Sequence, residues 1–174
     1  MSDYARYLLF YRYCQEMTKI GELPFFDTQE EQEEAARSFI ESPYALWIDL
    51  YDEDLIVGFL IIEFGENTHP MTDYYIAQAY VTPEHRGKGI MKNAVQNFIK
   101  EHGGDYVLFV LLKNPNAEAF WRKIFAEMGY EENAKLPVLK GTLDENVAKQ
   151  IGFWNRQNKI LEKKHAEEKE KEKE

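Results

Sequence analysis

This sequence has almost no cysteine, and its basic residues are outnumbered by acidic ones. Among 174 residues there is one cysteine, Cys14, so the chain can form neither an intrachain disulfide nor a cysteine-based metal cluster. Lys and Arg number 21 against 31 Asp and Glu, which gives a formal net charge of −10. Because binding to nucleic-acid phosphates needs clustered cations, this balance argues against a nucleic-acid partner. It suits a cationic acceptor molecule, although solubility is the more common reason for acidity.

Long apolar segments are also missing. No apolar run approaches the roughly 20 residues that a membrane helix needs. The first residues, Met1 to Tyr4, lack the basic and then apolar layout of a secretory signal. Together with the single cysteine, these features predict a cytoplasmic protein without a membrane partner.

The sequence does contain enough apolar material for a core. Hydrophobic residues make up 44% of it and aromatic residues 14%, more than a disordered chain carries. The length suits one domain, which we expect over residues 1–160. Residues 161–174 are a Lys/Glu run without an apolar anchor, so we expect a charged tail that is either a solvated helix or disordered.

Apolar periodicity in the first half predicts two helices and then three strands. Helical spacing of apolar residues covers 3–17, and Thr28 ahead of Glu30 and Glu31 is an N-cap signal for a second helix that ends near Ile40. The strands are predicted over residues 44–51, 55–64 and 73–81. The middle one is almost entirely apolar, which indicates a central strand covered on both faces.

The second half predicts a helix up to about His102, a strand over 106–112, and a helix from Asn114 to Met128 that Gly129 ends. A strand, a helix and a strand of these lengths form a right-handed parallel unit. Beyond Tyr130 the pattern is weaker. It suggests a strand over 137–143 and a short helix over 144–154.

A glycine turn joins the strand that ends at Val81 to the following helix. The turn reads Arg86-Gly87-Lys88-Gly89, and the helix begins at once. The first turn of a helix has unpaired N–H groups and a partial positive charge, and glycines let an anion approach closely. With Arg86 and Lys88 adding formal charge, the segment predicts a cradle for a pyrophosphate.

Two other phosphate-binding motifs are excluded at this turn. The spacing G-x-x-x-x-G-K-[ST] of a Walker loop is absent, and so is the third glycine of a dinucleotide fingerprint. A bare R-G-x-G would more often be a pair of helix caps. The preceding Val81 and Pro83, the basic pair and the strand–helix context favour anion binding.

The segment Val81–Ile90 resembles motif A of the GNAT acetyltransferases, [QR]-x-x-G-x-[GA], on which Arg86 to Met91 fall. The segment Asn114–Trp121 and the pair Gly129-Tyr130 resemble a second family segment. The resemblance covers about residues 3–130. It implies an α/β (α+β) fold with a mixed, mostly antiparallel sheet, a splayed parallel strand pair, and helices on both faces.

The resemblance also implies acetyl-CoA as co-substrate. The cofactor would lie where the strand ending at Val81 splays from the strand 106–112, with backbone pairing to the pantetheine arm, N–H groups on the pyrophosphate, and two residues on the opposite wall. In that order, the implied residues are Tyr80, Val81 and Thr82; Arg86, Gly87, Lys88, Gly89, Ile90 and Met91; Asn114 and Phe120.

The chain departs from the family pattern where catalysis is concerned. Met91 replaces a small motif residue but keeps its N–H. Trp121 stands where many members have a tyrosine acid, and indole cannot serve as one, so helix packing is the favoured interpretation. Tyr75 and Phe109 stand where members have a glutamate base. Tyr75 would need a large downward shift of its pKa to act as a base.

A water chain could replace the missing base. Glu63, Asp73 and Tyr75 are candidates for its polar wall, although a sheet-surface role is more common for such residues. His69 and His85 are expected in loops and solvated, with no second ligand at metal spacing. His85 could instead add charge beside the pyrophosphate.

The leading hypothesis is an acetyl-CoA-dependent N-acetyltransferase acting on a primary amine of a small molecule or a peptide by direct attack. The rate of acetyl transfer would come mainly from positioning of the thioester against the amine and from stabilisation of the oxyanion. The alternative is a GNAT-fold sensor or interaction module that binds acyl-CoA with weak or no catalysis. Family members are often monomers or homodimers, and we expect one of these states.

Overall fold

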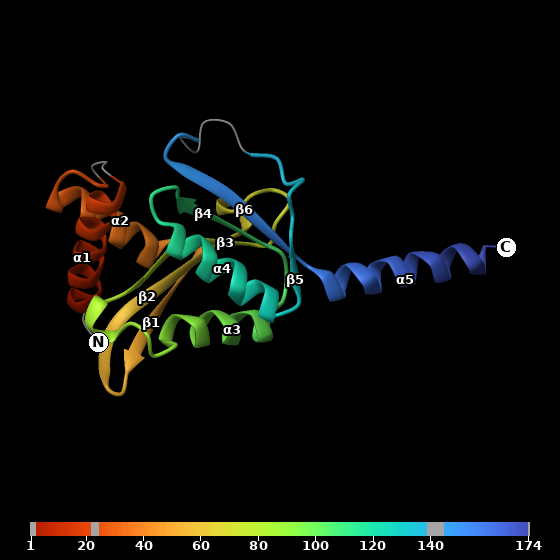
Figure 1. The fold of residues 1–174 in the computed structure, drawn as a ribbon, viewed down its shortest axis with the longest axis horizontal. Helices are drawn as coiled ribbons and strands as arrows, with labels where there is room; N and C mark the ends of the chain where they lie inside the picture. The colour runs from red at the N-terminus through yellow and green to blue at the C-terminus, as the bar shows by residue number, and fades with distance from the viewer. Residues whose placement is uncertain (1–2, 22–24, 139–144, 174) are drawn as a thin grey trace.

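The fold is a six-stranded sheet with helices on both faces (Figure 1). The computed structural model describes residues 3–21, 25–138 and 145–173. The strand order is β1-β2-β3-β4-β6-β5. Apolar residues of α1 and α2 pack on one face, and those of α3 and α4 pack on the other. The sheet is therefore the middle of three layers.

The helices and strands follow the order expected from the sequence as far as α4. Their bounds are α1 Tyr4–Gly21, α2 Gln29–Glu41, β1 Ala45–Asp52, β2 Leu55–Phe64, β3 Tyr74–Val81, α3 Ile90–His102, β4 Tyr106–Leu111, α4 Pro115–Glu127, β5 Tyr130–Glu132, β6 Ala148–Asn155 and α5 Arg156–Glu172. Two short 3-10 turns lie before and after β3, at η1 Gly65–Asn67 and η2 Pro83–His85.

Side chains cap the starts of α2 and α4. The Thr28 hydroxyl accepts a hydrogen bond from Glu31 N at 3.1 Å, which confirms the N-cap expected there. At α4 the Asn114 carboxamide oxygen accepts from Ala117 N at 3.3 Å, and proline follows at the first helical position. These bonds satisfy donors that have no partner within the helix.

All neighbouring strands are antiparallel except β3 and β4, which are parallel, as the strand–helix–strand pattern predicts. The connection between them runs through α3. The strand β2 is central and buried along most of its length, as its apolar sequence predicts. The sheet is thus mixed and mostly antiparallel.

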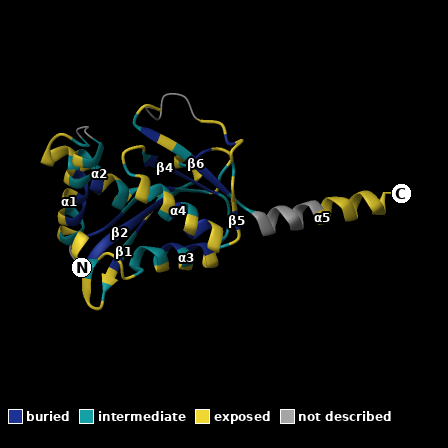
Figure 2. Cartoon of the chain, viewed as in Figure 1, coloured by how far each residue is buried: buried dark blue, intermediate teal, exposed yellow. Residues whose placement is uncertain are grey.

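Two clusters of buried residues form the core, one on each face of the sheet. Figure 2 shows burial concentrated in the sheet and on the helix sides that face it. In the larger cluster the rings of Phe125 and Phe153 stack at 4.2 Å, and Trp121 is buried in the same cluster. In the smaller cluster Phe10 of α1 contacts Trp47 and Phe59 of the sheet. Trp121 therefore packs in the core, as favoured from the sequence.

The helix expected over residues 144–154 is wrong, because residues 148–155 form β6. This strand pairs with β4 along the whole of β4, from Tyr106 opposite Phe153 to Leu111 opposite Ala148. The free edge of β4 and the glycine at position 152 favour the strand over the helical spacing of the apolar residues. Of the strand expected over 137–143, Pro137 and Val138 are not in a strand, and 139–143 lie outside the described residues.

The last helix, α5, leads away from the rest of the molecule (Figure 1). Its described side chains, from Lys164 to Glu172, are exposed, as expected of a charged helix in solvent. Within the described part of the chain, no helix combines the length and apolarity needed to cross a membrane.

Replacing Gly58 by alanine tests the close pairing of β2 with β3. A Cβ at Gly58 would lie 2.1 Å from the Tyr80 carbonyl oxygen, which belongs to the backbone and cannot swing aside. We expect Gly58→Ala to lower the free energy of unfolding by about 1–3 kcal/mol or more, measured by urea denaturation. The control is Gly152→Ala, whose Cβ would meet the flexible end of Leu136 at 2.6 Å. Equal losses in the two variants would contradict the backbone clash.

Replacing Asn114 by alanine tests the cap of α4. The variant loses the hydrogen bond to Ala117 N, and we expect a loss of about 0.5–2 kcal/mol in the free energy of unfolding. Asn116→Ala, at an exposed position two residues after the cap, is the control and should stay within about 0.5 kcal/mol of the parent. A loss at Asn116 as large as that at Asn114 would argue against the cap.

Candidate functional site

The parallel strands β3 and β4 separate after a short contact. They pair only over Tyr74–Ile76 and Tyr106–Leu108. Opposite β2, Ile61 pairs with Gln78 and Ile62 with Ile76, so Ala77 is an extra residue in β3. Such a bulge bends its strand and increases the local twist. It coincides with the point where β4 leaves β3, so the residues after it face no strand on that side.

The backbone of Val81 faces this opening. Thr82 N donates to Val57 O in β2 at 2.9 Å. Because backbone groups alternate in direction along an antiparallel strand, those of Tyr80 face β2 as well and those of Val81 face away from it. The Val81 carbonyl accepts a hydrogen bond from Arg86 Nε at 2.8 Å. Among Tyr80, Val81 and Thr82, the residues predicted for pantetheine pairing, Val81 is thus the one whose backbone is directed into the opening.

The glycine turn presents the free amides of α3 beside that opening. Gly87 and Gly89 have φ angles of 83° and 75°, and Gly89 is the N-cap residue of α3 without a side-chain cap. The first N–H with an acceptor in the helix is that of Asn93, bonded to Gly89 O at 2.9 Å. The N–H groups of Gly89, Ile90 and Met91 precede it and have no acceptor within the helix. The predicted cradle of backbone donors is therefore present as geometry.

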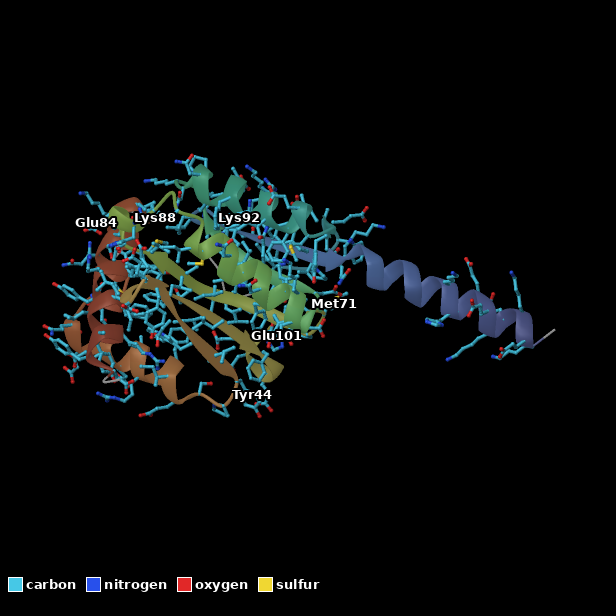
Figure 3. The ribbon with its side chains drawn as sticks, turned by 90° about the horizontal axis from the view of Figure 1, so that it is seen from below. Tyr44, Met71, Glu84, Lys88, Lys92 and Glu101 are labelled. Atoms are coloured by element: carbon cyan, nitrogen blue, oxygen red, sulfur yellow. The ribbon has the colours of Figure 1, made fainter. Side chains whose placement is uncertain are left out.

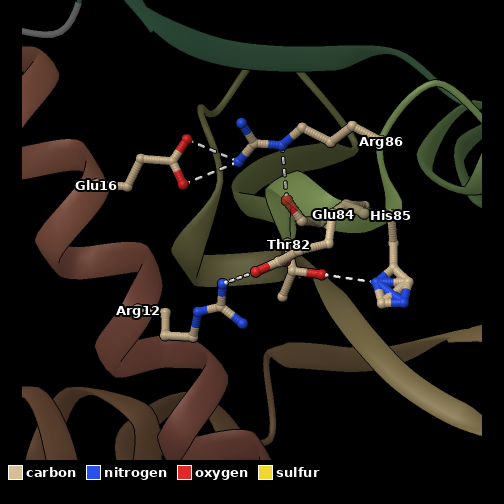
Figure 4. A network of polar contacts seen from close by, with 7 residues as sticks. Arg12, Glu16, Thr82, Glu84, His85 and Arg86 are labelled. Carbon is tan, nitrogen blue, oxygen red and sulfur yellow. Dashed lines mark hydrogen bonds and ion pairs between the residues drawn. The ribbon is translucent and has the colours of Figure 1, made fainter.

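The charged side chains around the turn are paired with acids of other elements. Two reciprocal pairs tie α1 to the turn: Arg12 to Glu84 at 2.7 Å, and Arg86 to both carboxylate oxygens of Glu16 at 2.7 and 2.9 Å (Figure 4). The Arg86 guanidinium also lies over the Tyr80 ring at 5.6 Å. These side chains fix the turn against α1 while the backbone amides stay free.

Lys88 is paired in the same way with Asp52, at the β1–β2 hairpin. The hydrogen bond from Lys88 lowers the pKa of the Asp52 carboxyl. Glu84, Lys88 and Lys92 follow one another in a row at the start of α3 (Figure 3). Lys92 pairs with Glu127 of α4 at 3.1 Å. The positive charge of Lys88, like that of Arg86, is thus balanced within the chain.

The opposite wall is built by the end of β4 and the start of α4. Asn114 N donates to Leu111 O at 2.9 Å, and its side chain caps α4. Phe120 is half-buried and meets Trp121 edge-on at 5.1 Å. Asn114 therefore lies directly after β4, and Phe120 lies on α4, the helix that follows it.

Tyr75 cannot act as the base. Burial, with a smaller contribution from Glu63, raises the pKa of Tyr75 to about 12, whereas a base would need a lowered one. Its hydroxyl stays protonated near neutral pH and can donate a hydrogen bond. The Tyr75 ring meets Phe109 of β4 edge-on at 5.5 Å. Tyr75 and Phe109 thus lie side by side near the point where the strands part.

Asp73 holds the sheet together rather than lining the opening. Its carboxylate accepts a hydrogen bond from Asp105 N at 2.8 Å, which connects the start of β3 to the start of β4. This end of the sheet is where the strands are paired, away from the splay. The expectation that Asp73 belongs to a polar wall therefore has no support in the geometry.

The histidines differ from the solvated loop residues expected. His69 is buried, accepts from Met71 N at 3.0 Å through Nδ1, and contacts Pro137 O at 2.8 Å through Nε2. Because Nδ1 accepts, the proton lies on Nε2 and is donated to Pro137 O. His85 is half-buried, and its Nδ1 is 3.2 Å from the Thr82 hydroxyl. Both rings are thus held by local contacts.

Two residues near the opening were missed in the sequence. Glu16 lies on α1 and pairs with Arg86. Gln78 lies on the splayed part of β3 and accepts a hydrogen bond from the Tyr13 hydroxyl. A single amide within a strand of apolar and aromatic residues was the available signal for Gln78. Within the described residues, no group of three His, Cys, Asp or Glu side chains could hold a metal ion.

Comparisons with known proteins agree with this geometry. The model of the acetyltransferase (GNAT) family matches residues 10–126. An acetyltransferase from Thermus thermophilus is 17% identical, covers 84% of this chain and 88% of its own, and has a TM-score of 0.60. A GNAT acetyltransferase from Staphylococcus aureus is 14% identical, covers 87% and 93%, and has a TM-score of 0.58.

No curated protein sequence matches the chain. The two structural likenesses concern the fold, which is the mixed sheet with one parallel pair implied by the resemblance in motif A. The family model covers well over half of the chain and includes the glycine turn. The chain therefore belongs to the GNAT acetyltransferase family and is an acyltransferase.

Proposed function

We propose that the protein binds acetyl-CoA and transfers the acetyl group to a primary amine of a small molecule or a peptide. The observation that carries this proposal is the row of free amides at the start of α3, next to the unpaired edge of β3. In the proposal, the N–H groups of residues 87–91 hold the pyrophosphate. The backbone of Val81 pairs with the pantetheine arm as an added strand would.

The paired cations leave the backbone as the main contact for the pyrophosphate. Arg86 and Lys88 are balanced by Glu16 and Asp52, and exposed pairs of this kind are worth about 1 kcal/mol or less. Arg86 and Lys88 add positive potential at the turn only to the extent that Glu16 and Asp52 do not cancel their charge. The proposed affinity therefore rests on the left-handed glycines and the amides that they orient.

The acceptor approaches from the other side of the opening. The amine nitrogen attacks the thioester carbonyl, and the oxyanion that develops is stabilised by N–H groups along the unpaired edge of β3. Collapse of this intermediate breaks the C–S bond and releases CoA as the thiolate, which takes up a proton from solvent. Positioning by β3 and by the wall of Asn114 and Phe120 supplies much of the rate. Trp121 takes no part in proton transfer, because it is buried in the core.

Replacing the two turn glycines tests the cradle. Gly87→Ala/Gly89→Ala places Cβ atoms on residues with left-handed φ angles, which costs about 1–2 kcal/mol each and turns the amides away. We expect acetyl-CoA to bind at least tenfold more weakly, measured by isothermal titration calorimetry. The matched control is Gly103→Ala at the other end of α3, where φ is 61° and a Cβ has open space. It should lose stability but keep the affinity of the parent.

Binding and turnover separate the proposed enzyme from the alternative module. The parent protein is titrated with acetyl-CoA and then assayed for CoA release with a panel of monoamines, diamines, amino sugars and lysine peptides. Release that depends on one class of amine supports the transferase. Tight binding with no release on any amine would instead identify an acyl-CoA-binding module, and no binding at all would refute the cradle.

A further inference from the structure

Four polar side chains cross the sheet on the face that α1 covers. Glu63 of β2 lies directly opposite Tyr75 of β3 in the strand register. Because Ala77 is an extra residue, Tyr75 and Gln78 lie on the same face although they are three positions apart. Tyr13 of α1 donates to Gln78 from above. The row runs from the splayed part of β3 to the last part of β2.

Tyr75 stands in the middle of this row. The Tyr75 ring contacts Phe109, which is the first β4 residue beyond the paired segment. The Tyr75 ring therefore lies toward the opening. The Tyr75 hydroxyl is close enough to Tyr13 to contribute to the raised pKa of that residue, after burial as the main cause. On its other side Tyr75 interacts with Glu63. It therefore lies between the opening and a carboxylate.

Glu63 is half-buried and has polar but no cationic neighbours. Burial raises the pKa of its carboxyl, and a hydrogen bond with Asn67 opposes this shift. The groups that face it are Tyr75 from β3 and Asn67 from η1, while its neighbour on β1 is Ala45. Within the described residues, Glu63 forms no ion pair. A carboxylate in this state accepts a proton more readily than one paired with a cation.

We propose that Glu63 is the terminal proton acceptor of the acetyl transfer and that the Tyr75 hydroxyl relays the proton to it. This inference rests on the proposed function. The acceptor nitrogen gives up a proton to the Tyr75 oxygen, directly or through water, while the Tyr75 proton passes to the Glu63 carboxylate. The nitrogen loses one proton, Glu63 gains one, and Tyr75 is neutral before and after. Glu63 then releases the proton to solvent on its exposed side.

A relay of this kind agrees with the raised pKa of Tyr75. A base must hold the proton that it removes, and a phenol with a pKa of about 12 is not ionised near neutral pH to do so. A relay only exchanges one proton for another, so no tyrosinate forms. The hydroxyl has to donate toward Glu63 and to accept from the opening, which one phenol can do at once.

The test compares Glu63→Gln and Tyr75→Phe with the parent protein, using the amine that the panel assay identifies. We expect each variant to lower kcat about 100-fold or more, the range for loss of general base catalysis. Because the two residues act as one unit, the double variant should be no slower than either single variant. The acetyl-CoA affinity should be unchanged in all three, since neither residue faces the turn.

The pH profile distinguishes a proton acceptor from a residue that only supports the structure. Replacing a purely structural residue would leave the shape of the profile unchanged. In the parent protein, kcat/KM should fall at low pH as Glu63 becomes protonated, besides the dependence set by protonation of the amine itself, and Glu63→Gln should remove the Glu63 limb and leave only that of the amine. Glu66→Gln, an exposed glutamate in η1, is the control and should keep both the rate and the limb. Tyr75→Phe gives the same test should the Gln variant not fold.

Two results would overturn the relay. One is a Glu63 limb that persists beside that of the amine in Glu63→Gln or Tyr75→Phe, and the other is a double variant whose loss is the product of the single losses. Both leave the proposed function intact, because the parent still binds acetyl-CoA and turns over the amine. A parent protein that does neither would overturn the proposed function, and the relay with it.

Discussion

The extra residue in β3, Ala77, is the feature on which the rest of the site depends. An unbulged β3 could continue its pairing with β4, and no backbone donors would be free between them. The bulge also turns Gln78 to the face that carries Tyr75, and it aims the end of β3 toward the glycine turn. The bulge thus lies where the opening begins, and the residues after it place Gln78 on the face of Tyr75 and the backbone of Val81 toward the opening.

The two faces of the sheet contribute different parts of the proposed site. On one face α3 contributes its first turn and α4 contributes the opposite wall, both anchored in the larger core cluster. On the other face α1 lies over β3 and is fastened to the glycine turn by the pairs of Arg12 with Glu84 and Glu16 with Arg86. The turn is thereby held from both sides of the sheet. A shift of α1 would therefore be transmitted to the turn that precedes α3.

The sequence predicts those parts of the site that depend on local chemistry. Glycines between a strand and an amphipathic helix are readable because few residues adopt left-handed φ angles, and the cap at Thr28 is readable because its hydroxyl bonds three residues away. The bulge at Ala77, the strand β6 and the contact of His69 with Pro137 depend on partners far along the chain. Glu16 illustrates the same limit, since nothing in α1 indicates that Arg86, 70 residues later, will pair with it.

The replacement of a glutamate by Tyr75 has an electrostatic consequence for catalysis. A carboxylate next to the thioester would repel the oxyanion that develops there, and this repulsion grows where water is excluded. With Tyr75 at that position and Glu63 on the neighbouring strand, the negative charge lies one strand further away, across a neutral phenol. In the proposed relay the proton still leaves the amine, because the hydroxyl passes it on without becoming charged. The separation also leaves Glu63 half-exposed, so that it can return the proton to solvent after each turnover.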